Sequence, residues 1–120
     1  MHELSIVSGI VDAVAESLRA YPGAKLTEVR LRVGALAAVD EESLQFCYGV
    51  ATQGTALEGS VLVVDVLPVL AYCCACCRIQ SIQGLQSFQC RECGSPTNDV
   101  RQGRELEIAS IEIEEAAEKV

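Results

Sequence analysis

The spacing of apolar residues predicts a helix and then a strand in the first third of the chain. Between residues 6 and 18, apolar side chains recur at helical spacing and define one face of an amphipathic helix. Pro22 and Gly23 end this helix, because proline cannot continue it and glycine permits the turn. Between residues 26 and 33, apolar and charged side chains alternate, which is typical of a half-buried strand.

A second helix and a second strand are predicted next. Asp40 is expected to cap the free backbone N–H groups of this helix, and the acidic residues after it suit the positive end of the helix dipole. Cys47 on its inward face is interpreted as a small buried hydrophobic residue and not as a ligand. The expected inward face comprises Leu44, Cys47, Val50 and Ala51. The apolar run from residue 61 to 69 predicts a central strand that ends near Pro68.

The composition changes between residues 72 and 104, where cysteine, glutamine and small polar residues replace most large apolar ones. Alternation resumes at Glu105, and its parity slips between Ile108 and Ile111, which predicts a bulge. We therefore predict an α+β fold, with a small, mostly antiparallel three-stranded sheet and two helices. Residues 1–70 and 104–120 would form this domain, and residues 71–103 would form a smaller domain inserted between two strands.

Charge and composition narrow the classes of partner. The 120 residues include 17 Asp and Glu against 9 Lys and Arg, for a formal net charge of −8. This excess repels phosphate backbones and anionic lipid surfaces, so we expect neither nucleic acid nor membrane as a partner. The N-terminus lacks the basic region of a secretory signal, and we expect a cytoplasmic protein. Seven cysteines in a reducing compartment indicate metal binding or redox chemistry before disulfides.

Two Cys-x-x-Cys pairs in the inserted segment predict a metal site. Cys73 and Cys76 form one pair, and Cys90 and Cys93 form the other. Two thiolates three positions apart can hold one metal ion from a tight turn, and two such turns complete the tetrahedron that Zn(II) favours. The segment is therefore predicted to be a zinc-ribbon-like domain. Because the segment is poor in apolar residues, the free energy of metal binding would supply much of its stability.

Other interpretations of these cysteines stay open at this point. Cys74 and Cys77 form a second Cys-x-x-Cys pair offset by one residue, and either could replace a ligand or remain a free thiol. We prefer Cys73 and Cys76. Iron in a rubredoxin-type site would use the same ligands. A dithiol redox site is a further alternative, although the βαβ setting of such sites is not evident.

The N-terminus carries a second group of possible ligands around His2, the only histidine of the chain. The amine of Met1, the backbone nitrogen of His2 and the Nδ1 atom of its ring can close adjacent chelate rings. Nitrogen ligands in a plane suit Ni(II) or Cu(II). A carboxylate from Glu3 or from elsewhere in the chain could complete the set. The competing interpretation is that His2 is a solvated residue at a frayed terminus.

Several short motifs occur together along the chain. They are residues 1–5 (MHELS), 33–36 (VGAL), 39–40 (VD), 42–46 (ESLQF), the paired Cys-x-x-Cys motifs, and Ile108 with residues 110–112 (SIE). This combination spans essentially the whole chain and resembles the HypA/HybF family of nickel chaperones. The chain departs from the usual pattern at Glu41, where a proline is common, and in its extra Cys74 and Cys77.

The resemblance implies a function and a set of ligands. It implies that His2 is the essential Ni(II) ligand, assisted by the Met1 amine, Glu3 and Asp40. It also implies that zinc is held by Cys73, Cys76, Cys90 and Cys93. The implied partners are a nickel-handling GTPase and the large-subunit precursor of a nickel–iron hydrogenase.

The residues themselves give no sign of an enzyme. The single histidine at the terminus leaves no nucleophile–base pair with a third orienting group, and no phosphate-binding glycine-rich loop is present. We therefore do not expect an enzyme, and the resemblance implies a nickel metallochaperone. The alternative from another class is a zinc-ribbon protein-interaction module without metal transfer. An iron-based electron carrier would be coloured, whereas a zinc protein is colourless.

Overall fold

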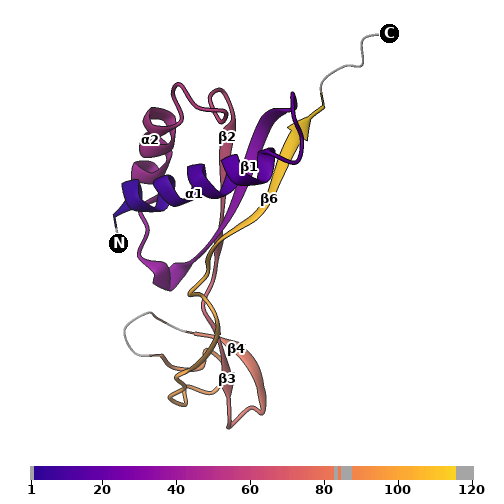
Figure 1. Cartoon of the computed structure of the whole chain (residues 1–120). Helices are drawn as coiled ribbons and strands as arrows, with labels where there is room; N and C mark the ends of the chain where they lie inside the picture. The colour runs from indigo at the N-terminus through magenta and orange to yellow at the C-terminus, as the bar shows by residue number, and fades with distance from the viewer. Residues whose placement is uncertain (1, 83, 85–87, 116–120) are drawn as a thin grey trace. The chain divides into compact units, whose positions relative to one another are not determined.

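The structure, a computed structural model, describes residues 2–82, 84 and 88–115 (Figure 1). Backbone contacts divide the chain into two units. Unit 1 comprises Met1–Leu31, Val39–Val64 and Ile108–Val120, and unit 2 comprises Arg32–Ala38 and Asp65–Glu107. No helix among the described residues is long and apolar enough to cross a membrane.

Two helices of unit 1 contact each other, and each buries one narrow apolar stripe. The first, α1 (Glu3–Leu18), begins earlier than the periodicity predicts. Its buried side chains are Ile6, Val7, Ile10 and Val14. The second, α2 (Glu41–Ala51), contacts α1 and buries Leu44 and Tyr48. Both helices therefore contribute a narrow apolar stripe to one core.

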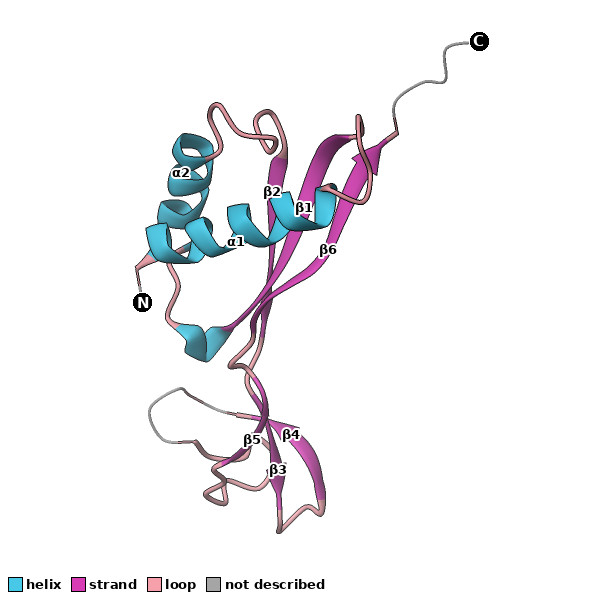
Figure 2. Cartoon of the chain, viewed as in Figure 1, coloured by secondary structure: helices cyan, strands magenta, loops and turns pink. Residues whose placement is uncertain are grey.

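Three strands form the first sheet, in the order β2-β1-β6 (Figures 1 and 2). They are β1 (Lys25–Gly34), β2 (Val61–Leu67) and β6 (Leu106–Glu114). The central strand β1 buries Val29, Leu31 and Val33, as its alternation predicts. In β6 the two neighbours Ala109 and Ser110 are both exposed, so the burial pattern changes parity where the sequence does.

Three predictions about the second helix and strand are wrong. β2 is an edge strand of the described sheet, not a central one, and its Val61 and Val66 are more than half exposed. On α2, Tyr48 is buried while Val50 is 54% exposed, because the helix turns its Leu44–Tyr48 stripe inward. Asp40 does occupy the N-cap position, but its side chain makes no capping hydrogen bond.

Unit 2 contains a second antiparallel three-stranded sheet, in the order β4-β3-β5. The strands are β3 (Leu70–Cys73), β4 (Arg78–Ser81) and β5 (Asp99–Gln102). A small core of Val69, Ala71 and Ile82 supports this sheet. Partly buried Ala35, Leu36, Phe88 and Val100 pack against that core. Few large apolar side chains are buried here, which agrees with the composition of the segment.

Candidate metal centres

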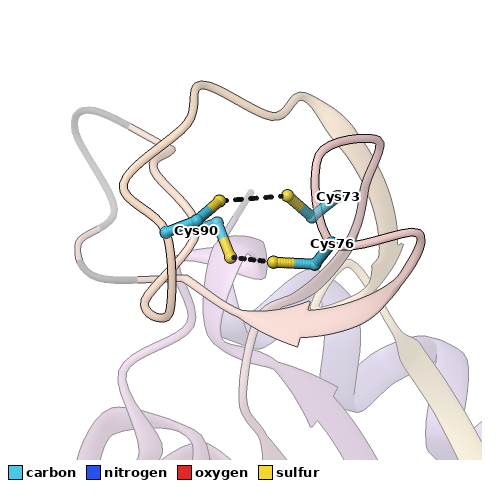
Figure 3. A group of neighbouring side chains, drawn as sticks. Cys73, Cys76 and Cys90 are labelled. Atoms are coloured by element: carbon cyan, nitrogen blue, oxygen red, sulfur yellow. Dashed lines mark hydrogen bonds between the residues drawn. The ribbon is translucent and has the colours of Figure 1, made fainter.

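Four cysteine sulfur atoms of unit 2 form one cluster (Figure 3). The Sγ atoms of Cys73, Cys76, Cys90 and Cys93 all lie within 4.8 Å of one another. The Sγ atoms of Cys73 and Cys93 are 3.5 Å apart, and those of Cys76 and Cys90 are 3.9 Å apart. A tetrahedral zinc ion with Zn–S bonds of about 2.3 Å places its sulfur ligands about 3.8 Å apart. The donor set and its dimensions therefore fit zinc.

Two tight turns present these sulfur atoms. Cys73 is the last residue of β3 and pairs with Arg78, the first residue of β4, so a four-residue turn carries Cys76 back toward Cys73. Cys90 forms an isolated bridge with Ile82 and accepts a 2.8 Å hydrogen bond from the backbone N–H of Gly94. Gly94 has a φ of 74°, a conformation that glycine adopts without steric cost. The second turn therefore closes beside the first.

The thiols of the cluster differ in acidity. Hydrogen bonds from the side chain and backbone of Ser95 lower the pKa of Cys93 to about 6. A hydrogen bond with Cys93, together with burial, raises the pKa of Cys76 to about 12. Cys93 therefore becomes a thiolate first and accepts hydrogen bonds from its neighbours. A metal ion that binds all four sulfur atoms must displace the remaining protons.

The two offset cysteines lie outside this cluster. Cys74 and Cys77 are both exposed, in the turn between β3 and β4. The structure thus brings together the four cysteines that the sequence analysis preferred and excludes the other pair. The hairpin register decides this, because Cys73 ends the strand with its side chain buried and Cys74 begins the turn.

The second group of predicted ligands borders an open groove of about 720 Å³ between α1 and α2. His2, Glu3 and Asp40 line this groove, although Asp40 is 37 residues from Glu3 in the sequence. Its lining is completed by Leu4, Ser5, Glu42, Ser43, Phe46 and Cys47. Met1, the fourth predicted ligand, lies outside the described residues.

Hydrogen bonds connect the two acidic residues of the groove. The carboxylate of Glu3 accepts a 3.4 Å hydrogen bond from the backbone N–H of Asp40. The carboxylate of Asp40 accepts a 2.6 Å hydrogen bond from the hydroxyl of Ser43. Across residues 2–82, 84 and 88–115, however, the cysteine cluster is the only set of three or more metal-ligand atoms this close together. The groove is therefore an open site and not a closed cage.

The groove also contains a residue that the sequence analysis interpreted differently. Cys47 is half-buried and lines the groove, so it is not simply a buried core residue. Asp40, Ser43 and Cys47 recur at spacings of three and four residues, which places them on one helix face. That spacing is the sequence feature from which the position of Cys47 beside Asp40 could be predicted. Phe46, 73% exposed at the same groove, gave no comparable signal.

Comparison with known proteins identifies relatives that match nearly the whole of this chain. Residues 1–113 match the family model described as "Hydrogenase/urease nickel incorporation, metallochaperone, hypA". Hydrogenase maturation factor HypA from Chlorobaculum tepidum is 39% identical over 114 residues, covering 95% of this chain and 100% of the relative. Hydrogenase maturation factor HybF from Klebsiella pneumoniae is 37% identical over 112 residues, covering 93% and 98%.

Solved structures show the same fold. The solution structure of the nickel metallochaperone HypA from Helicobacter pylori superimposes with a TM-score of 0.65 at 21% identity, covering 97% of this chain and all of that one. A second HypA solution structure gives a TM-score of 0.70 at 22% identity, with 94% and 96% covered. With its nearly full-length family match and a cysteine cluster that fits a metal ion, this chain belongs to the HypA family of nickel metallochaperones and hydrogenase maturation factors.

Proposed function

We propose that this chain binds Ni(II) at its N-terminus and delivers it for maturation of a nickel–iron hydrogenase. The proposed ligands are the Met1 amine and the backbone nitrogen and ring Nδ1 of His2, assisted by Glu3 and Asp40. The observation that carries the proposal is the groove between α1 and α2, where His2, Glu3 and Asp40 lie together. Membership of the HypA family supports nickel as the cargo.

An open groove suits a metal that must be released. His2 is exposed, so a recipient can add ligands to the metal while the chain's own ligands leave. The hydrogen bond from the Asp40 N–H holds the Glu3 carboxylate near the start of α2. Glu3 and Asp40 thus supply negative charge beside His2 without enclosing the ion, which favours capture of a divalent cation and exchange to a partner.

The rim of the groove offers a surface for the recipient. Leu4 is 59% exposed and Phe46 is 73% exposed, and both line the groove. Large apolar side chains gathered on a surface mark sites of protein association. We infer that a partner covers this rim during transfer, with a nickel-handling GTPase and the hydrogenase large-subunit precursor as the proposed partners. Neither nucleic acid nor a membrane is a proposed partner.

The cysteine cluster is proposed to hold structural Zn(II). Closed four-cysteine zinc sites are usually structural, and zinc would stabilise a unit that buries few large apolar side chains. In this assignment residues 71–103 form the zinc-binding domain, and residues 1–70 and 104–120 form the nickel-binding domain. We propose that the protein acts in the cytoplasm and is not an enzyme.

Nickel titration of the tag-free chain that keeps Met1 tests the proposal. His2→Ala and Glu3→Gln should weaken nickel binding, whereas Glu16→Gln on the exposed part of the same helix serves as the matched control. Zinc content, measured on every variant, should stay at one ion per chain. Equal nickel binding by the parent and by His2→Ala would overturn the N-terminal site.

The exposed rim also favours an alternative, a zinc-ribbon protein-interaction module without metal transfer. This alternative needs Leu4 and Phe46 but not the N-terminal amine. A histidine-free extension of three residues before Met1 separates the two, because it moves the terminal amine out of reach of the chelate rings that it closes with His2. Loss of hydrogenase maturation in cells that carry the extended chain supports nickel delivery. Full maturation with that chain supports the interaction module.

A further inference from the structure

Two exposed thiols stand beside the four-cysteine cluster without belonging to it. Cys74 and Cys77 are the first and last residues of the turn between β3 and β4. The strands pair with Cys73 opposite Arg78, so the next positions along the hairpin place Cys74 opposite Cys77. The first and fourth residues of a tight turn have Cα atoms less than about 7 Å apart. A disulfide needs a Cα separation of about 4.4–6.8 Å.

The Cys77 side chain already lies against Cys74. Its Sγ atom is 3.2 Å from the carbonyl oxygen of Cys74. Cys77 has a φ of 56°, in the left-handed region that L residues rarely adopt, and this backbone conformation closes the turn. The sulfur of Cys77 is therefore held beside the residue with which it would bond. Rotation of the exposed Cys74 side chain is the main movement needed.

We propose that Cys74 and Cys77 form a surface dithiol that closes to a disulfide by exchange with a small-molecule disulfide such as glutathione disulfide. The thiolate of one cysteine attacks a sulfur of glutathione disulfide, forming a mixed disulfide and releasing one glutathione thiol. The second cysteine thiolate then attacks the protein sulfur of the mixed disulfide and releases the second glutathione. Two protein thiols are oxidised and one glutathione disulfide is reduced to two glutathiones.

The dithiol differs in accessibility from two of the four zinc ligands. Cys73 and Cys90 are 1% and 0% exposed, whereas Cys76 is half-buried and Cys93 is exposed, as Cys74 and Cys77 are. For Cys76 and Cys93 it is therefore the bound zinc, and not burial, that separates them from the dithiol. Sulfur atoms that coordinate zinc are also less reactive as nucleophiles toward a disulfide. This part of the inference rests on the proposed zinc site. Unit 2 thus carries a redox-responsive pair on its surface, while the zinc-bound cluster next to it stays assembled.

Treatment of the zinc-loaded full-length chain with glutathione disulfide tests the proposal. Cys47→Ser serves as the parent background, because it removes the remaining free thiol. Intact mass should show the loss of two hydrogen atoms, and peptide mapping should place the disulfide between Cys74 and Cys77. Cys74→Ser and Cys77→Ser, which keep one thiol each, should instead retain a single glutathione adduct.

Each other outcome has a defined meaning. Stable glutathione adducts in the parent background, or no reaction, would overturn the dithiol. A disulfide that includes Cys73, Cys76, Cys90 or Cys93 would overturn it as well. Zinc is measured in the same samples before and after oxidation. If the purified chain holds no zinc but the Cys74–Cys77 disulfide still forms, the zinc site is wrong and the dithiol stands.

Discussion

Replacement of Gly34 by alanine should destabilise unit 2 strongly, for a steric reason that the structure makes explicit. A Cβ atom at Gly34 would lie 2.0 Å from the carbonyl carbon of Gly103 and 2.5 Å from the backbone nitrogen of Arg104. Non-bonded carbon atoms approach to about 3.5–4.0 Å, so the two backbone segments must separate by roughly 1.5 Å. Both neighbours are backbone atoms, so no side-chain rotation can relieve the overlap.

The magnitude follows from the contacts that this separation breaks. The N–H of Gly34 donates to the Glu105 carbonyl, and the N–H of Leu36 donates to the Gly103 carbonyl, each at 2.7 Å. Each such bond contributes about 0.5–1.5 kcal/mol, and overpacking of a buried position costs about 1–3 kcal/mol more. Gly34→Ala should therefore lower the free energy of unfolding by about 2–6 kcal/mol. The φ of Gly34 is −73°, which alanine adopts freely, so backbone strain adds nothing.

Urea unfolding, followed by circular dichroism in a fixed excess of zinc, measures this loss. Gly49→Ala is the matched control, because Gly49 lies within α2 with nothing within 4 Å of the added Cβ. That variant should gain up to about 1 kcal/mol from helix propensity. An unfolding midpoint for Gly34→Ala equal to that of the parent would refute the steric argument.

Three further predictions concern ionisation, a buried hydrogen bond and metal removal. Burial raises the pKa of Tyr48 above 10.0, partly offset by its hydrogen bond with Ser60. The unfolded chain thus ionises first, and stability is present below pH ~10 and lost as pH rises through the folded pKa, by at most ~1.4 kcal/mol per pH unit. Urea midpoints of Tyr48→Phe should lack this component of the pH dependence. The buried hydroxyl of Thr97 donates to the Tyr72 carbonyl, so Thr97→Val should cost about 1–3 kcal/mol in the same assay. Chelation of zinc should expose unit 2 to proteolysis while the helical circular dichroism signal remains, and unchanged cleavage would count against the structural metal.

The helices and strands could be predicted where one face is buried and the other is solvated. The alternation in β1 and the apolar stripe of α1 both follow from that asymmetry. Prediction failed for β2, which lies at the edge of the sheet. Its apolar run would look the same in the sequence whether one or two strands paired with it. The rotation of α2, which buries Tyr48 instead of Val50, likewise depends on its contact with α1.

The two candidate sites differ in how much of them the sequence could reveal. The cysteine ligands lie in two local turns, so spacing alone locates the cluster, although only the β3–β4 register separates Cys73 from Cys74. The groove depends on contact between the two helices. Glu3 and Asp40 are joined by a hydrogen bond across 37 residues, and no local pattern encodes that contact. Cys47 joins the groove for the same reason.

If the proposed function holds, the contrast between the two sites also determines which metal must bind first. Four sulfur donors within 4.8 Å of one another form a nearly complete ligand set, whereas the groove presents separated nitrogen and oxygen donors. A thiolate set of this kind can take Ni(II) as well as Zn(II), since both are borderline ions. Under the proposed function, nickel would therefore reach the groove reliably only when zinc already fills the cluster. The closed site would retain its ion because all its ligands are local, and the open site would release its ion because its ligands are few and exposed. Selectivity in this chain would thus come from occupancy and geometry more than from the intrinsic affinity of either ligand set.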